Sequence, residues 1–104
     1  VSGSGDVTLD VNSTNVDASV TGSGDLTLTG QTTNLNASVT GSGDFHGGRL
    51  MADYTEAKVT GSGDVVVYAK EAIKARVTGS GDIEYKGSPS KVDKKVTGSG
   101  DISN

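Results

Sequence analysis

Several residue types that usually stabilise a small domain are scarce in this chain of 104 residues. It has no cysteine, no tryptophan, one proline, three tyrosines and one phenylalanine. The absence of cysteine excludes a disulfide framework and a thiolate metal site. With 32% hydrophobic residues and 16 glycines, the composition alone favours disorder, because little apolar surface is available to offset chain entropy. An ordered fold therefore depends on where the apolar residues stand in the sequence.

Positive charge is absent from the first half of the chain. Residues 1–48 hold five acidic residues and no Lys or Arg, whereas residues 49–104 hold nine bases beside eight acids. A nucleic-acid-binding surface needs a basic stripe with interleaved aromatic residues, so we expect no nucleic-acid partner. The chain also lacks a long apolar run and a signal-peptide pattern, and we therefore predict no transmembrane segment.

What the chain does have is a repeat. The tetrapeptide Gly-Ser-Gly-Asp begins at six positions that lie 18 to 20 residues apart, namely Gly3, Gly22, Gly41, Gly61, Gly79 and Gly98. A period this regular is typical of one supersecondary unit stacked on copies of itself. Residues 1–104 are therefore predicted to form a single solenoid domain.

Apolar residues alternate with polar ones on both sides of each tetrapeptide, which is the pattern of a strand with one buried face. The odd repeat length requires this parity to flip once per repeat. We expect the flip in variable turns at Gln31–Asn34, His46–Asp53, Ala69–Glu71 and Gly87–Lys91. The predicted core residues are Val16, Ala18, Val20, Leu26, Leu28, Leu35, Ala37, Val39, Phe45, Ala57, Val59, Val65, Val67, Ile73, Ala75, Val77, Ile83 and Tyr85.

Two all-β architectures produce such alternation. A meander of antiparallel hairpins places turn signals every 8–12 residues, whereas here the marker recurs once in about 19 residues and always in the same sense. Identical residues then stack in register only if equivalent strands are parallel. We predict an all-β parallel β-helix of roughly five rungs, in which one rung is one turn of the solenoid.

The glycines of the repeat are predicted to form structural corners, since glycine tolerates positive φ and close approach of another backbone. These corners are Gly22, Gly24, Gly41, Gly43, Gly61, Gly63, Gly79, Gly81, Gly98 and Gly100.

The aspartates of the repeat are predicted to form one outward column, the aspartate ladder. Neighbouring carboxylates about 4.8 Å apart repel each other by roughly 1 kcal/mol in water, so something has to compensate. The favoured interpretation is hydrogen bonding to turn amides or to Ser and Thr hydroxyls. The alternative is a calcium ladder, although the spacing departs from the nonapeptide of calcium-binding β-rolls. The ladder comprises Asp6, Asp25, Asp44, Asp64, Asp82 and Asp101.

No catalytic or cofactor signature accompanies the repeat. His46 is the only histidine, and no His, Cys or clustered acidic partner stands at ligand spacing in the sequence, so we expect neither a metal site nor a serine nucleophile with its base. Asp25 and Asp44 are predicted neighbours at the separation that retaining glycosidases use, but the uniformity of the ladder argues against an active site. We predict no enzymatic activity and no cofactor.

The recurrent Val-Thr-Gly-Ser-Gly-Asp-apolar segments resemble the head GIN domain of putative auto-transporter adhesins. The segment Asp82–Pro89, followed by Lys94–Gly100, is similar to the C-terminal signature of that family. The resemblance implies a right-handed parallel β-helix in the envelope of a Gram-negative bacterium (periplasm, outer membrane or cell surface) or in a secreted protein. It also implies that the chain is the C-terminal portion of a larger domain. Thr55 and Gly47 depart from the pattern, because other rungs place larger apolar residues there.

Three hypotheses for function remain. The first is a non-enzymatic, adhesin-like scaffold or binding module with a surface glycan or protein ligand. The second is a structural element that self-associates through open β-helix ends, since an exposed rung offers unpaired backbone groups. The third is a carbohydrate-binding β-helix, for which Tyr68 and Arg49 are candidate contacts. The stretch His46–Tyr54 breaks the repeat most and is the first place to search for a site.

Overall fold

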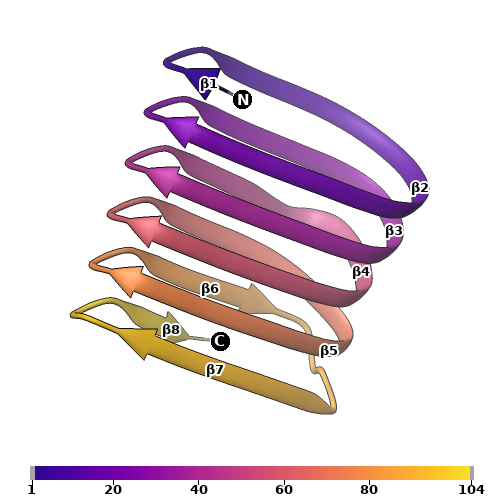
Figure 1. Ribbon diagram of the computed structural model, residues 1–104. Helices are drawn as coiled ribbons and strands as arrows, with labels where there is room; N and C mark the ends of the chain where they lie inside the picture. The colour runs from indigo at the N-terminus through magenta and orange to yellow at the C-terminus, as the bar shows by residue number, and fades with distance from the viewer. Residues whose placement is uncertain (1, 104) are drawn as a thin grey trace.

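The computed structural model describes residues 2–103, and these form a solenoid of parallel strands with no helix (Figure 1). The strands are β1 (Ser2–Gly3), β2 (Asp6–Gly22), β3 (Asp25–Gly41), β4 (Asp44–Gly61), β5 (Asp64–Gly79), β6 (Asp82–Lys86), β7 (Lys91–Thr97) and β8 (Asp101–Ser103). Every pairing between them is parallel, and equivalent residues of successive repeats face each other. The predicted parallel β-helix is confirmed, and the coil in Figure 1 is right-handed, the usual hand for parallel connections.

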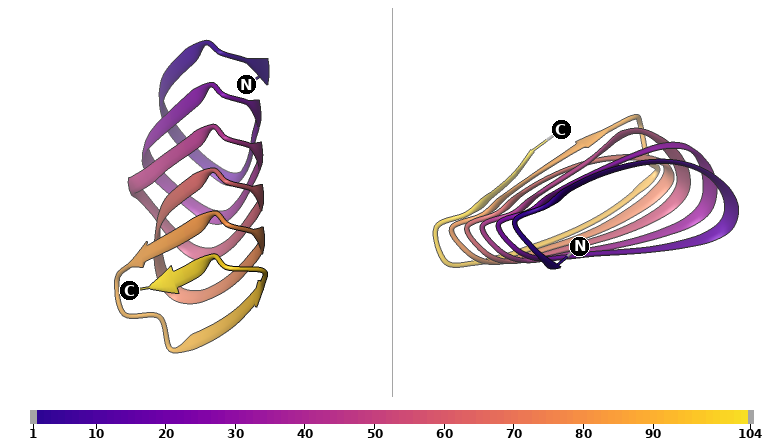
Figure 2. Two further views of the ribbon diagram at one scale, coloured as in Figure 1. Left: turned by 90° about the vertical axis from the view of Figure 1, so that its left-hand side faces the viewer. Right: turned by 90° about the horizontal axis from the view of Figure 1, so that it is seen from above.

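Each complete rung is one long strand that bends without leaving the sheet. Viewed along the solenoid axis, a rung is a flattened oval with a narrow corner at one end and a broad bend at the other (Figure 2). The expectation that Gln31–Asn34, His46–Asp53 and Ala69–Glu71 are turns outside the strands is wrong, because all three lie within β3, β4 and β5. A neighbouring rung of similar length supplies hydrogen-bond partners for the bending backbone. Of the four predicted turns, only Gly87–Lys91 leaves the sheet, between the end of β6 at Lys86 and the start of β7 at Lys91.

The core is made of mainly aliphatic side chains inside the oval, with Phe45 and Tyr85 among them. The predicted core residues are buried, except that Val16 is half-buried. The parity flips at the broad bend, as predicted: in β3 the buried positions pass from Thr32 to Leu35. Bending within the strand adds core residues that the alternation did not predict, namely Leu50, Ala52 and Ala69.

The two atypical positions of β4 are each compensated locally. A side chain at Gly47 would collide with the ring of Phe45, so the missing side chain at Gly47 makes room for the large ring, which is fully buried. Thr55 lies between Leu35 and Ile73 in the stack and is buried, and its hydroxyl donates a hydrogen bond of 3.0 Å to the carbonyl oxygen of Tyr68. A buried polar group is thereby satisfied.

At the narrow corner, the first glycine of the five tetrapeptides from Gly22 to Gly98 has positive φ, for example 102° at Gly41 and 108° at Gly61. Its carbonyl oxygen accepts two amides from the next rung: Gly41 O accepts Ser62 N–H at 3.1 Å and Gly63 N–H at 3.0 Å. The second glycine of the same five tetrapeptides is buried. It faces inward, where a Cβ at Gly63 would lie 2.7 Å from Val39 Cγ1 and against the carbonyl oxygen of Gly43. We name this element the glycine corner, Gly-Ser-Gly-Asp in every rung.

Candidate functional site

The aspartate ladder forms as a continuous column beside the glycine corner. Its six members are in register from β2 to β8. Part of the compensation is visible: Asp44 Oδ1 accepts the backbone N–H of Asp64 at 3.2 Å, and Asp82 Oδ1 accepts that of Asp101 at 3.1 Å. The donors therefore belong to the next aspartate of the ladder. Between Asp25 and Asp44, and again between Asp64 and Asp82, the pattern differs: the N–H of Asp44 donates to Gly24 O and that of Asp82 to Gly63 O, each at 3.3 Å.

The expectation that His46 has no acidic partner at ligand distance is wrong. One ligand atom each from Asp25, Asp44 and His46 lie within 4.8 Å of one another. The two aspartates are half-buried and the histidine is exposed, whereas Asp64, Asp82 and Asp101 of the same ladder are exposed. Two features of the sequence signal this grouping: His46 follows Asp44 by two residues on the same outward face, and Asp25 precedes Asp44 by one rung.

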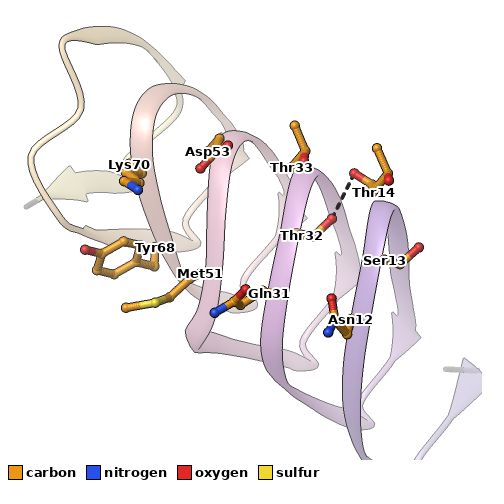
Figure 3. A pocket seen from close by; sticks show the side chains of 10 residues that line it. All are labelled: Asn12, Ser13, Thr14, Gln31, Thr32, Thr33, Met51, Asp53, Tyr68 and Lys70. Atoms are coloured by element: carbon orange, nitrogen blue, oxygen red, sulfur yellow. Dashed lines mark hydrogen bonds between the residues drawn. The ribbon is translucent and has the colours of Figure 1, made fainter.

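A polar groove crosses four rungs at the broad bend, over strands β2 to β5. Its volume is about 480 Å³. It is lined by Asn12, Ser13, Thr14, Gln31, Thr32, Thr33, Met51, Asp53, Tyr68 and Lys70 (Figure 3). Of the predicted glycan contacts, Tyr68 lies in this groove and Arg49 is not among its lining residues.

The groove has two side walls that follow the solenoid axis. One wall is a column of side chains that face each other in successive rungs, and its last two members are Met51 and Tyr68. The other wall ends in Asp53 and Lys70 (Figure 3). Thr32 lies between the walls and is buried, and its hydroxyl contacts the carbonyl oxygens of Thr14 and Asn34 at 3.1 Å each. The full first wall is Asn12, Gln31, Met51 and Tyr68.

Sequence patterns did not reveal the groove because the spacing of its columns is irregular. The register shifts in β4, so Met51 faces Tyr68 with an offset of 17 residues instead of 19 or 20. The stretch His46–Tyr54, expected to be the most irregular, does contribute Met51 and Asp53 to the groove.

Charged side chains elsewhere form surface pairs between rungs. The outward column Asp17, Asn36, Glu56, Lys74 and Asp93 is in register. Within residues 2–103 one ion pair is found, between Arg76 and Asp93 at 4.0 Å, and Lys94 Nζ lies 5.8 Å from the centre of the Tyr85 ring. Exposed pairs of this kind contribute little to stability.

The parallel strands and the thin, mainly aliphatic core define the chain as a β-solenoid. The chain belongs to the family described as putative auto-transporter adhesin, head GIN domain, whose model matches residues 1–89. The resemblance drawn from the sequence is thereby confirmed, although the Lys94–Gly100 part of the expected signature lies outside the matched range.

Three solved bacterial structures share the fold of this chain. A putative adhesin from Parabacteroides distasonis is 32% identical with a TM-score of 0.93, over 98% of this chain and 43% of that one. A putative adhesin from Bacteroides fragilis is 34% identical with a TM-score of 0.77, over 94% and 52%. A putative lipid binding protein from P. distasonis is 29% identical with a TM-score of 0.76, over 98% and 50%. The chain thus spans about half the length of these proteins, and no curated protein matches it.

No described segment is a helix long and apolar enough to span a membrane.

Proposed function

We propose that the domain is a non-enzymatic binding module of the bacterial envelope or of a secreted protein, and that it holds a glycan in the polar groove. Membership of an adhesin family supports a role in surface attachment. The observation that carries the proposal is the groove itself, which crosses four rungs at the bend where the repeat is least regular.

The lining of the groove suits an uncharged polyhydroxylated ligand. Amide and hydroxyl groups at one end donate and accept hydrogen bonds, and the half-buried ring of Tyr68 beside the exposed Met51 offers an apolar surface at the other. Asp53 and Lys70 are the charged lining residues and carry opposite signs. Such a lining attracts neither anions nor cations, which favours a neutral glycan over a charged polymer.

The direction of the groove suits a linear chain. Four stacked rungs span roughly 14 Å at the spacing of neighbouring strands, and the columns repeat a polar contact at each step. A glycan that lies along the solenoid axis would thus meet one new side chain per rung. A protein ligand would contact a wider area than this groove offers.

The test is a glycan array followed by calorimetry with the best ligand. Tyr68→Ala and Gln31→Ala should each weaken binding by about tenfold or more, because both remove groove contacts. Tyr54→Ala is the matched control, since Tyr54 is 52% exposed and is absent from the groove lining; it should leave binding unchanged. Absence of any glycan ligand, or equal loss in all three variants, contradicts the proposal. Captured protein ligands would favour the protein alternative, and release of reducing ends from the bound glycan would contradict the non-enzymatic role.

Self-association through the ends stays a prediction. Light scattering over a wide concentration range tests it: a monomer at all concentrations rules it out, and fibres in electron micrographs support it.

A further inference from the structure

We propose that Asp25, Asp44 and His46 bind one divalent transition-metal ion of the zinc class on the outer face of β3 and β4. The inference is independent of the glycan groove, because none of the three residues lines it. It rests on the composition of the ligand set, on its geometry and on the contrast with the rest of the aspartate ladder.

The ligand set combines one imidazole nitrogen with two carboxylates. Imidazole favours ions such as Zn²⁺, Ni²⁺ and Cu²⁺, whereas Ca²⁺ prefers oxygen ligands alone. Across the ladder, the position two residues after each aspartate is in register and is occupied by Thr8, Thr27, His46, Val66, Glu84 and Ser103. Of these six residues only His46 supplies a nitrogen ligand, so a site of this composition can form at one position of the ladder.

The three ligand atoms are near the separations that a bound ion requires. Tetrahedral ligand atoms at 2.0–2.2 Å from a metal lie about 3.3–3.6 Å apart, and the three ligand atoms here lie within 4.8 Å of one another. Side-chain movement of up to about 1 Å would bring them to bonding distance, and the exposed His46 has room to move. Three ligands from one side leave coordination positions open towards solvent.

Hydrogen bonding holds one ligand and leaves the others available. The backbone N–H of Asp64 donates to Asp44 Oδ1 at 3.2 Å, which orients this carboxylate in the way that outer partners orient metal ligands. Within the described residues, the side chains of Asp25 and His46 have no hydrogen bond or ion pair. The steps from Asp25 to Asp44 and from Asp64 to Asp82 both lack the amide compensation seen at Asp44 and Asp82. Only the first of these two steps has a histidine beside it, and there a cation would supply the compensation.

The ladder provides a matched control for the test. Asp82 Oδ1 accepts the N–H of Asp101 at 3.1 Å, just as Asp44 Oδ1 accepts that of Asp64, but Glu84 replaces the histidine two residues later. Asp44→Asn and Asp82→Asn therefore each remove one negative charge from an aspartate that accepts the backbone N–H of the next rung. Asparagine keeps a carbonyl oxygen for the amide donor, and thermal unfolding without metal checks that both variants fold.

The experiment is isothermal titration of the untagged chain with ZnCl₂ at neutral pH, repeated with CaCl₂, and supported by the visible absorption spectrum of added Co²⁺. The expected result is one zinc site per chain, weakened about tenfold or more by Asp44→Asn and by His46→Ala, and changed less than about twofold by Asp82→Asn. Absence of zinc binding overturns the proposal. Equal weakening by Asp82→Asn, or calcium binding that His46→Ala leaves unchanged, would also overturn it and would favour the oxygen-only calcium ladder.

Discussion

The glycine corner and the broad bend are the two ends of the same oval, and they obey different constraints. At the corner, register is kept without interruption from β2 to β5, and Gly22, Gly41, Gly61 and Gly79 stack on one another. At the bend, the register between strands shifts, between Thr27 and Thr29 of β3 and between Gly47 and Met51 of β4. The corner needs glycine in successive rungs because of backbone sterics. At the bend, Gly30 with φ of 119° is in register with Val11 and Leu50, so several residue combinations satisfy the bend. The bend is therefore the end that can acquire a groove without loss of the fold.

The largest effect is expected from adding a methyl group at the corner. Gly61→Ala should destabilise the fold by about 3 kcal/mol or more, because φ is 108° and the new Cβ would lie 2.7 Å from Gly41 O. Gly48→Ala at the bend is the control: its Cβ would lie 3.2 Å from Val66 Cγ1, and the expected cost is below about 1 kcal/mol. Urea unfolding of both variants measures the difference. Similar costs would show that the two ends are equally constrained.

A second test examines whether volume alone fixes the bend. Gly47→Val should cost about 2 kcal/mol, because its side chain meets the Phe45 ring. In a Phe45→Leu background the same change should cost far less, since Leu26 and Val67 already occupy these two register positions in the neighbouring rungs. A double-mutant cycle should give a coupling of about 1–2 kcal/mol. Additive effects would refute a shared volume constraint.

A moderate effect is expected at Thr55. Thr55→Val keeps the shape but removes the hydrogen bond to Tyr68 O, so the free energy of unfolding should fall by about 0.5–1.5 kcal/mol. The exposed Thr40 is the control, and Thr40→Val should stay within about 0.5 kcal/mol. A stabilising Thr55→Val would mean that burial of the methyl group outweighs the hydrogen bond.

The smallest effect is expected on the ladder. Asp64→Asn should stabilise the fold by up to about 1 kcal/mol, because Asp64 lies between Asp44 and Asp82 in register. The gain should shrink in 1 M salt, where screening is strong. Asp17→Asn, whose register neighbour is the uncharged Asn36, should have no comparable effect. Destabilisation by Asp64→Asn would show that the carboxylate makes a favourable interaction.

Much of the fold follows from the sequence, because in a parallel stack the repeat length determines which residues are neighbours in successive rungs. If residue i faces residue i+19, the residues that stack on Val39, Ala37 and Leu35 can be read directly from the sequence. The repeat length does not predict the neighbours in β4, because the register shifts there and Leu50 enters the core at a position that the alternation does not predict. The groove was missed for the same reason, since its columns cross the shifted register.

The sequence by itself determined the rung length, the inward parity and the glycine corner, because these depend on local sterics and on a repeat that every rung shares. Only the tertiary structure decided that the bends stay within the sheet, that Tyr68 stands beside Met51, and that Asp25 and Asp44 lie within ligand distance of His46. Those features depend on register shifts and side-chain rotamers in neighbouring rungs. They are set by packing between rungs, which a single repeat cannot specify.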